Sequence, residues 1–220
     1  MHIQPFSCTR PQPDRLDALR PFASAAELDA AVAAGEYTCD VSRALYLVGH
    51  AVGGVATYGV VCCCSADELG AGVALPEADA DVVAAEAHHL GALGAHDAPV
   101  TITYPGNIAL NYILGAARTS TPLYNLQREG EQLVIWRVSR PEAVEAICAT
   151  FEQIEGEVAA QAEAAWTARE VAGRAREQRP DLDERAAALH PLAVLVTRED
   201  FERAKADVLP MRGLLMHRFA

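Results

Sequence analysis

Three histidines lie close together in the chain, between positions 88 and 96. His88 and His89 are adjacent, and His96 follows His89 by seven positions. Imidazole side chains bind metal ions and act as general acids or bases near neutral pH, so such a group could carry chemistry. A helix could place His89 and His96 two turns apart, but Gly91 and Gly94 weaken a helix between them. The pattern favours an exposed histidine pair at a helix end over a complete site.

A site around these histidines would need carboxylate partners. Glu77 and Asp79 precede the histidines, and Asp97 directly follows the last of them. Carboxylate and imidazole groups form metal sites or acid–base pairs when they converge in one pocket. The sequence therefore leaves open an enzymatic site around Glu77, Asp79 and the three histidines.

Three adjacent cysteines form a second group with potential chemistry. On a β-strand, Cys62 and Cys64 would share one face and Cys63 would take the other. Two thiolates on one face could be half of a metal site. Cysteine also fills small core volumes, and the preceding Val60 and Val61 favour that role. We predict reduced core cysteines that form no disulfide framework and bind no metal.

The stretch from 157 to 179 is rich in alanine and charged residues. Alanine favours helix, so we predict one continuous helix through Gln161–Ala165, with no phosphate-sized pocket lined by its residues. Trp166 is large among small apolar neighbours, which suits an anchor packed in a groove of this chain or of a second copy. The helix is either solvated with one packed face, or it binds a protein partner or a second copy.

Several widespread catalytic motifs are absent from the sequence. It contains no Gly-x-Gly-x-x-Gly after a strand, no Walker A motif, no paired Cys-x-x-Cys at zinc spacing and no Gly-x-Ser-x-Gly. These absences argue against the two common phosphate-cradling loops, a zinc site of paired cysteines and an acyl-transfer serine.

The charge balance limits the partners of the chain. Its 220 residues carry a formal net charge of −12, and Lys205 is the one lysine. Phosphate backbones and anionic membranes would repel such a chain, so we expect no nucleic acid and no membrane partner. The first residues contain no apolar signal region, and no apolar run is long enough to cross a bilayer. We therefore expect a cytoplasmic protein.

Hydrophobic periodicity predicts hairpins interspersed with helices, after an extended lead-in at 1–22. The predicted strands and helices are strands 44–49, 55–64, 100–104, 121–127, 132–138 and 192–197, and helices 24–34, 79–93, 108–117, 157–179 and 181–189, with a further helix that starts at a capping box over 139–142. This order indicates an α/β fold, with α+β as the alternative, and a mixed sheet built from hairpins with flanking helices. We predict a single domain over 1–220.

Short segments along most of the chain resemble the DUF1015 family. They are Ile3–Phe6 with Arg10-Pro11, Ala44–Leu47, Tyr58–Val61, Ala98–Val100, Tyr104–Gly106, Leu133–Ser139 with Pro141–Ala143, and Leu192–Val196. No firm activity is known for that family. Its Gly-His-His-Arg motif is similar to that of free-serine kinases of the ParB/sulfiredoxin-like superfamily. The resemblance thus implies nucleotide-dependent phosphoryl transfer, with a nucleotide as its one implied cofactor.

The sequence departs from the family pattern at its polar motifs. The family's Pro-His-Glu falls on Leu75–Glu77, its Asp-Arg pair on Ala85-Glu86, and its Asp-Gly-His-His-Arg on Gln161–Ala165. The family's Pro-Tyr-Asp-Val segment is missing, so we expect a shortened N-terminal part. Phosphoryl transfer needs cations or backbone amides on the phosphates and a group that orients the nucleophile. The substituted residues offer neither.

Two functional hypotheses follow from these observations. The first is a catalytically degenerate relative that needs no cofactor and binds a ligand or a protein partner. The alternative is an active nucleotide-dependent small-molecule kinase, or another enzyme, with a site relocated to Glu77, Asp79, His88, His89 and His96. The first predicts no phosphate transfer from ATP, ADP or CTP, and the second requires those side chains to converge in a pocket.

Overall fold

The computed structural model describes residues 1–71, 75, 77–160, 162–204 and 208–219. Its main feature is an eight-stranded mixed sheet, which confirms the predicted α/β class. In spatial order the strands are β10 (Glu157–Ala160), β7 (Val100–Tyr104), β11 (Leu192–Thr197), β5 (Val55–Cys64), β4 (Leu45–Val52), β9 (Glu131–Val138) and β8 (Tyr124–Arg128), with β1 (Ile3–Gln4) paired to β5. Strands β7 and β11 are parallel, and the other neighbours are antiparallel.

The β4–β5 hairpin forms the centre of this sheet. Gly53 and Gly54 make its turn with φ angles of +57° and +84°, a region that glycine adopts without a Cβ clash. Side chains alternate between the two faces, so Cys62 and Cys64 join one core cluster and Cys63 joins the other. This alternation confirms the predicted placement of the three cysteines in the core.

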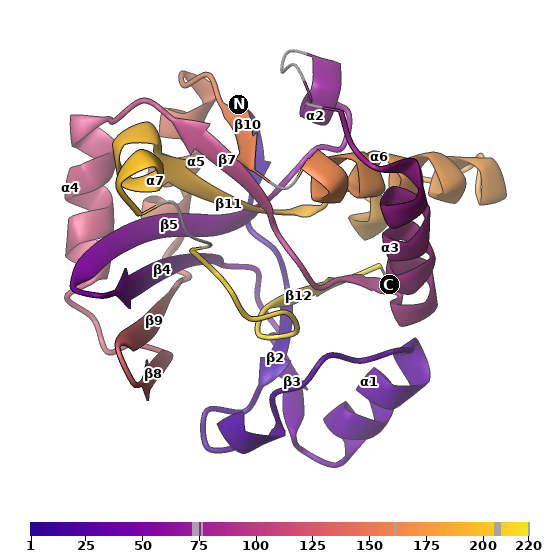
Figure 1. The fold of residues 1–220 in the computed structure, drawn as a ribbon, viewed down its shortest axis with the longest axis horizontal. Helices are drawn as coiled ribbons and strands as arrows, with labels where there is room; N and C mark the ends of the chain where they lie inside the picture. Colours follow the sequence, from indigo (N-terminus) through magenta and orange to yellow (C-terminus); the bar gives the residue numbers. More distant parts are fainter. Residues whose placement is uncertain (72–74, 76, 161, 205–207, 220) are drawn as a thin grey trace.

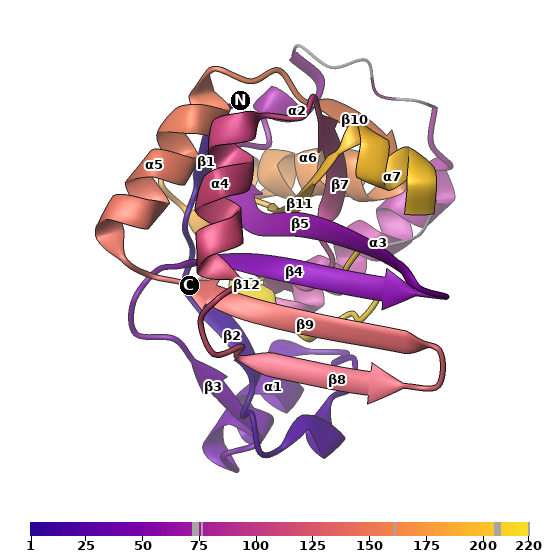
Figure 2. The same cartoon turned by 90° about the vertical axis from the view of Figure 1, so that its left-hand side faces the viewer.

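Helices α4 (Ile108–Ala117) and α5 (Pro141–Glu152) cover one face of the large sheet (Figure 2). The Asn107 side chain caps α4 by accepting from the backbone N–H of Leu110 at 3.0 Å. The predicted capping box at Ser139 is wrong, because the N-cap of α5 is Arg140 and no side chain caps it. Pro141 at the first helical position starts the helix, since its fixed φ suits that position.

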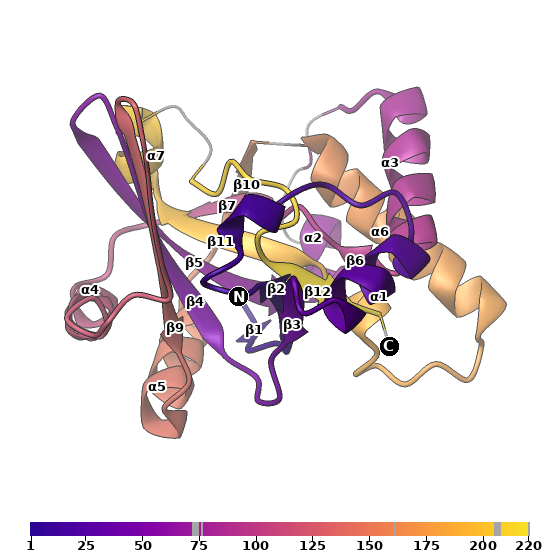
Figure 3. The same ribbon diagram turned by 90° about the horizontal axis from the view of Figure 1, so that it is seen from below.

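A second, four-stranded sheet lies against the other side of the molecule (Figure 3). Its order is β3 (Tyr37–Cys39), β2 (Cys8–Pro11), β12 (Met216–Arg218) and β6 (Ala95–His96), and helix α1 (Ala25–Ala33) packs against it. No sequence pattern predicts this sheet, and the expectation of an extended lead-in over 1–22 is wrong where β1 and β2 form. Strands of two to four residues show no periodicity, and the partners here come from distant parts of the chain.

Helices α3 (Ala80–Leu93) and α6 (Ala162–Gln178) lie side by side at one edge of the molecule (Figure 1). Asp79 caps α3 by accepting from the backbone N–H groups of Asp81 at 2.9 Å and Val82 at 3.3 Å. The predicted helix over 157–179 is wrong at its start, because Glu157–Ala160 pairs with β7. The hydrogen bonds that this sheet edge offers outweigh the helix propensity of alanine.

Gln161 lies outside the described residues, so the prediction of a helix through Gln161–Ala165 is confirmed only from Ala162 onward. The predicted helix over 181–189 is also wrong, since it contains only a 3-10 turn over Ala187–Leu189. The remaining short helices are α2 (Glu68–Ala71), α7 (Arg198–Ala204) and a 3-10 turn over Leu16–Ala18. Within the described ranges, no helix has the length and apolar character needed to cross a membrane.

Candidate functional site

The five candidate residues from the 77–96 region do not share one pocket. Glu77 lines a cavity of about 450 Å³ whose wall also includes Trp166 and Glu170. His88 lines another, of about 370 Å³, formed by α3, α6 and the C-terminal segment. His96 lines a third, of about 390 Å³. Asp79 is used as the cap of α3, and His89 pairs with Asp97. The structure thus disperses the residues that the relocated-site hypothesis requires together.

Trp166 lies in the cavity that contains Glu77. Its neighbours there include Val83 and Ala84 of α3, and the Arg169 guanidinium lies 5.1 Å from the centroid of the indole ring. The Trp166 side chain is 36% exposed. Trp166 therefore forms part of the wall of this cavity and is partly exposed to solvent.

The cavity that contains His96 has the most varied chemistry. Its walls come from α3, from the segment leading into β7, from the first turns of α6 and from the C-terminal segment. They consist of Val82, Glu86, Leu90, His96, Ala98, Pro99, Val100, Glu163, Ala164, Thr167, Ala168, Pro191, Leu209, Pro210 and Arg212. A volume of about 390 Å³ is in the range of small-molecule sites. We call this space the α3–α6 cavity.

His96 is a buried, neutral imidazole in the wall of this cavity. It stands on β6, opposite His217 of β12, and its ring meets Phe219 edge to face at 4.8 Å between centroids. Burial, with a smaller contribution from the nearby His217, lowers the pKa of His96 to about 3. The Nε2 atom of His96 is buried and has no hydrogen-bond partner among the described residues.

Two more buried polar atoms at this location lack a partner. Thr167, which lines the α3–α6 cavity, has an unpartnered Oγ1 atom among the described residues. Asp97, next to His96 in sequence, has the same property at its Oδ1 atom. A buried polar atom without a partner costs about 1–3 kcal/mol, and native proteins keep few of them. Of the nine such atoms in the described residues, those of His96 and Thr167 belong to residues that line the α3–α6 cavity.

Arg212 joins the cavity wall to a chain of charged groups. Its NH2 atom lies 2.6 Å from Oε2 of Glu86, and its Nε atom lies 3.6 Å from Oδ2 of Asp97. The same Asp97 oxygen lies 3.0 Å from Nε2 of His89. The positive charge of Arg212 is therefore already matched by two carboxylates.

The turn after Arg212 fixes its position. Gly213 has a φ of +80°, and an added Cβ there would lie 2.8 Å from the carbonyl oxygen of Arg20. Both observations require glycine at this position. The turn leads into β12, which pairs with β6 and so holds the C-terminal segment beside His96.

Glu163 adds a carboxylate with no hydrogen bond or ion pair among the described residues, and it stands in the first turn of α6. A carboxylate there is stabilised by the positive end of the helix dipole. The prediction that residues 161–165 line no phosphate-sized pocket is wrong, because Glu163 and Ala164 line the α3–α6 cavity. Helix α6 begins only after the edge strand β10, which places its first turn beside this cavity.

The cavity wall carries a negative balance of charge. Glu86 and Glu163 are acidic, and Arg212 is the basic residue among the described lining residues. No group of three or more His, Cys, Asp or Glu side chains in the described part of the chain has the geometry to hold a metal ion. The arrangement suits hydrogen bonding to a small polar ligand better than the binding of an anion.

The adjacent cysteines contribute nothing to this cavity. All six cysteines are free thiols, and Cys62, Cys63 and Cys64 are buried. Burial, followed by the effect of neighbouring groups, raises the pKa of each of these three thiols above its usual value. Buried protonated thiols are unreactive, which agrees with the predicted core role.

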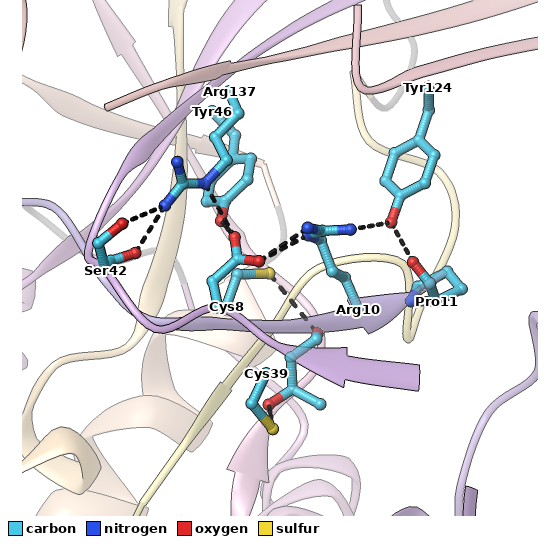
Figure 4. Close-up of polar contacts among 10 residues, drawn as sticks. Cys8, Arg10, Pro11, Cys39, Ser42, Tyr46, Tyr124 and Arg137 are labelled. Carbon is cyan, nitrogen blue, oxygen red and sulfur yellow. Dashed lines mark hydrogen bonds and ion pairs between the residues drawn. The ribbon is translucent and has the colours of Figure 1, made fainter. Parts of the chain in front are cut away.

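A second polar cluster joins the two sheets (Figure 4). Asp40, which follows β3, accepts from Arg10 of β2 at 2.8 Å and from Arg137 of β9 at 3.0 Å. The Tyr46 hydroxyl donates to the same carboxylate, and Arg10 also donates to the Tyr124 hydroxyl at 3.3 Å. Burial acts to raise the pKa of Asp40, but these donors outweigh it and hold the pKa below its usual value. We call this group the Asp40 cluster.

Most residues of the α3–α6 cavity carry no signal in the sequence. Glu163 lies in the segment that the family resemblance singles out. Thr167 and Arg212 had none, because each is a single polar residue whose neighbours in space are distant in sequence. In the Asp40 cluster, Arg10 carries a signal only as part of the Arg10-Pro11 pair, and no sequence pattern marks Asp40.

The comparisons with known proteins agree with the motif resemblance. The family model for DUF1015, described as a protein of unknown function, matches residues 6–200. No curated protein and no solved structure gives a significant match.

Proposed function

Since the chain belongs to the DUF1015 family, we propose that it is a catalytically degenerate member that binds a small molecule in the α3–α6 cavity and transfers no phosphate. One observation carries the proposal. Glu163 and Ala164 line this cavity, and by the family resemblance they stand where the motif has its two histidines, so the wall carries no imidazole there.

The electrostatics of the cavity support this proposal. Phosphoryl transfer needs cationic groups that are free to neutralise the phosphates. Arg212 is engaged by Glu86 and Asp97, and Glu163 places a carboxylate at the positive end of α6. A phosphate in this cavity would meet uncompensated negative charge. By the same argument, any ancestral phosphotransferase activity of a ParB/sulfiredoxin-like kind has been lost.

The experiment has a catalytic arm and a binding arm. The full chain is incubated with ATP, ADP or CTP and a set of hydroxyl-bearing metabolites, and phosphate release and transfer are measured. We expect turnover no higher than in a protein-free blank. Turnover that Glu77→Ala or Glu163→Gln abolishes would refute the proposal and favour the enzyme hypothesis.

The binding arm tests whether the cavity takes a ligand. Thermal shifts are measured with a panel of amines, alcohols, carboxylates and nucleosides on the wild type and on Ala164→Phe, which should fill the cavity. Ala149→Phe, at an exposed position of α5, is the matched control. We expect at least one compound to stabilise the wild type and Ala149→Phe but not Ala164→Phe. No such compound, or equal stabilisation of all three proteins, would contradict the proposal.

The wider setting of the protein is part of the proposal. Six free thiols suit a reducing compartment, so we place the protein in the cytoplasm. A net charge of −12 disfavours nucleic acid as a partner. Helix α6 remains the proposed surface for self-association or a protein partner, with the partly exposed Trp166 as its anchor.

One pair of residues, His89 and Asp97, still favours the alternative enzyme hypothesis. His89 and Asp97 lie 3.0 Å apart, and Asp97 is buried while His89 is 23% exposed on its side chain. A carboxylate that orients an imidazole is the supporting half of a general-base arrangement. Loss of turnover in both His89→Gln and Asp97→Asn, if turnover is found at all, would assign the reaction to this pair.

A further inference from the structure

We infer that helix α4 is a homodimer interface, on which a second copy of this chain docks antiparallel about a two-fold axis at Tyr112. The inference goes beyond the proposed function and does not depend on it. Helix α4 lies on the opposite side of the molecule from α3 and α6 (Figures 1 and 3), so this contact leaves the α3–α6 cavity open. The experiment below distinguishes α4 from α6, the other proposed surface.

The outer face of α4 is apolar and exposed. Ile108 is 89% exposed and Tyr112 is 80% exposed, and they stand one turn apart on the same side of the helix. The inner side chains Leu110 and Leu114 are buried in the core beneath it. The helix Ile108–Ala117 contains no charged residue, although the chain carries a net charge of −12. Two acidic copies repel each other least where the surfaces that meet carry no charge.

The residues of this face complement one another when two copies run antiparallel. With Tyr112 on the axis, Ile108 of one copy lies opposite Ala116 of the other, because both are four positions from Tyr112. Likewise Ala109 lies opposite Gly115. A large side chain thus meets a small one twice in each dimer, and the two tyrosine rings meet at the axis. The outer face of α4 is therefore self-complementary in shape.

The same alignment brings opposite charges together at both ends of the contact. Arg118 is the C-cap of α4, and its guanidinium carbon lies 4.2 Å from the centroid of the Tyr58 ring. At the other end, the Oε2 atom of Glu199 lies 3.6 Å from the place that a Cβ on Gly106 would occupy. Positions 118 and 106 are each six residues from the axis, so Arg118 of one copy faces Glu199 of the other. This charge complementarity favours a second copy as the occupant of the face.

The size of this face predicts a weak dimer. A helix of 10 residues is about 15 Å long. The contact therefore buries less than the roughly 800 Å² per partner that is typical of a stable interface. We expect a dissociation constant on the order of 10–100 μM at about 150 mM salt.

Sedimentation equilibrium of the full chain, from about 5 to about 500 μM, measures the self-association. Tyr112→Lys places two like charges at the axis, while it changes the formal net charge only from −12 to −11. We expect this variant to weaken the dimer at least about tenfold. Trp166→Ala, on α6, should leave the dissociation constant within about twofold of the wild type. Circular dichroism melts check that both variants are folded.

A charge swap tests the antiparallel orientation. Arg118→Glu and Glu199→Arg should each weaken the dimer about fivefold, because each places like charges opposite one another. The double variant exchanges the two charges and should return the dissociation constant to within about twofold of the wild type. Within one chain these residues lie at opposite ends of α4, so the recovery reports a contact between copies. Arg128→Glu, at an exposed position of β8, controls for the change in net charge.

Three results would overturn the inference. The first is a monomer at every concentration up to about 500 μM. The second is a dimer that Tyr112→Lys leaves intact or that Trp166→Ala dissociates, since either result assigns self-association to another surface. The third is a dimer that the double charge swap does not restore, because the docking would then not be antiparallel. None of these results alters ligand binding in the α3–α6 cavity, so the proposed function is tested separately.

Discussion

Two buried polar clusters of this protein differ in whether their hydrogen bonds are complete. In the Asp40 cluster, both carboxylate oxygens accept, one from Arg10 and the other from Arg137. In the α3–α6 cavity, His96 and Thr167 each keep a buried polar atom without a partner among the described residues. Completed networks hold elements together, whereas incomplete ones cost stability that a ligand can recover. The Asp40 cluster, which joins the two sheets, therefore differs from the candidate binding site more in how fully its polar atoms are hydrogen-bonded than in its charge.

The largest expected effect is a loss of stability at acidic pH, which arises at His96 and His217 and not in the Asp40 cluster. Burial lowers the pKa of His96 to about 3 and that of His217 to about 4, whereas both rise to about 6.5 on unfolding. Their contribution to stability is complete above pH 6.5 and is lost as the pH falls through the folded-state values. At about 1.4 kcal/mol per pH unit for each histidine, we expect the free energy of unfolding to fall by about 5 kcal/mol between pH 7 and 4.

Urea denaturation at several pH values between 7 and 4 measures this loss. The Asp40 cluster should contribute little there, because the pKa of Asp40 lies below its usual value of 3.8. His96→Gln should remove about half of the pH dependence, and His88→Gln, at an exposed position, should leave it unchanged. Equal pH dependence in wild type and His96→Gln would contradict the assignment.

Removing the charge of Asp40 should cause the next largest loss in the free energy of unfolding. Asp40→Asn keeps the shape but leaves Arg10 and Arg137 without their shared counter-charge, and these side chains are only 11% and 24% exposed. We expect a loss of about 3–5 kcal/mol in the free energy of unfolding, measured by urea denaturation at pH 7. A single unfolding transition by two probes would support the prediction that residues 1–220 form one domain.

Asp67→Asn is the matched control for Asp40→Asn. Asp67 also pairs with an arginine through two contacts, Arg176 NH1 at 3.0 Å and NH2 at 2.7 Å, but its side chain is 67% exposed. We expect this change to cost less than about 1 kcal/mol. Similar losses in the two variants would show that burial and network completeness do not govern these pairs.

Deleting the Tyr46 hydroxyl removes one hydrogen bond of the Asp40 cluster and leaves its charged groups in place. That hydroxyl donates to the Asp40 carboxylate, and Tyr46 is otherwise packed in the core. We expect Tyr46→Phe to lower the free energy of unfolding by about 1.5–3 kcal/mol, because the lost bond is to a charged group. A thermal or urea melt at pH 7 gives the value, and a change below about 0.5 kcal/mol would argue against a complete network.

Deleting the Thr167 hydroxyl should have the smallest effect on stability and the opposite sign. Thr167→Val keeps the shape and removes an unpartnered buried hydroxyl. We expect the free energy of unfolding, measured by urea denaturation at pH 7, to stay equal or to rise by up to about 1 kcal/mol. A loss of stability comparable to that of Tyr46→Phe would show that Thr167 is already satisfied in the fold.

Local patterns in the sequence determined most of the elements of this protein. The structure confirms the predicted alternation of the cysteines, and it contains the Gly53-Gly54 turn and the Asp79 and Asn107 caps, which are local features of the same kind. Short segments along the chain also predicted the DUF1015 family, which the family model over residues 6–200 confirms. These features were readable because turns, caps and side-chain alternation depend on neighbours a few positions away.

The tertiary structure alone decided the second sheet and the candidate site. Of the five residues proposed from the 77–96 region, His96 is the one that lines the α3–α6 cavity, and it does so because β6 pairs with β12 near the end of the chain. Arg212 and Thr167 join it from elements far away in sequence. Such pairings carry no periodic signal, because they depend on which short strands and helix faces remain to be buried once the main sheet has formed.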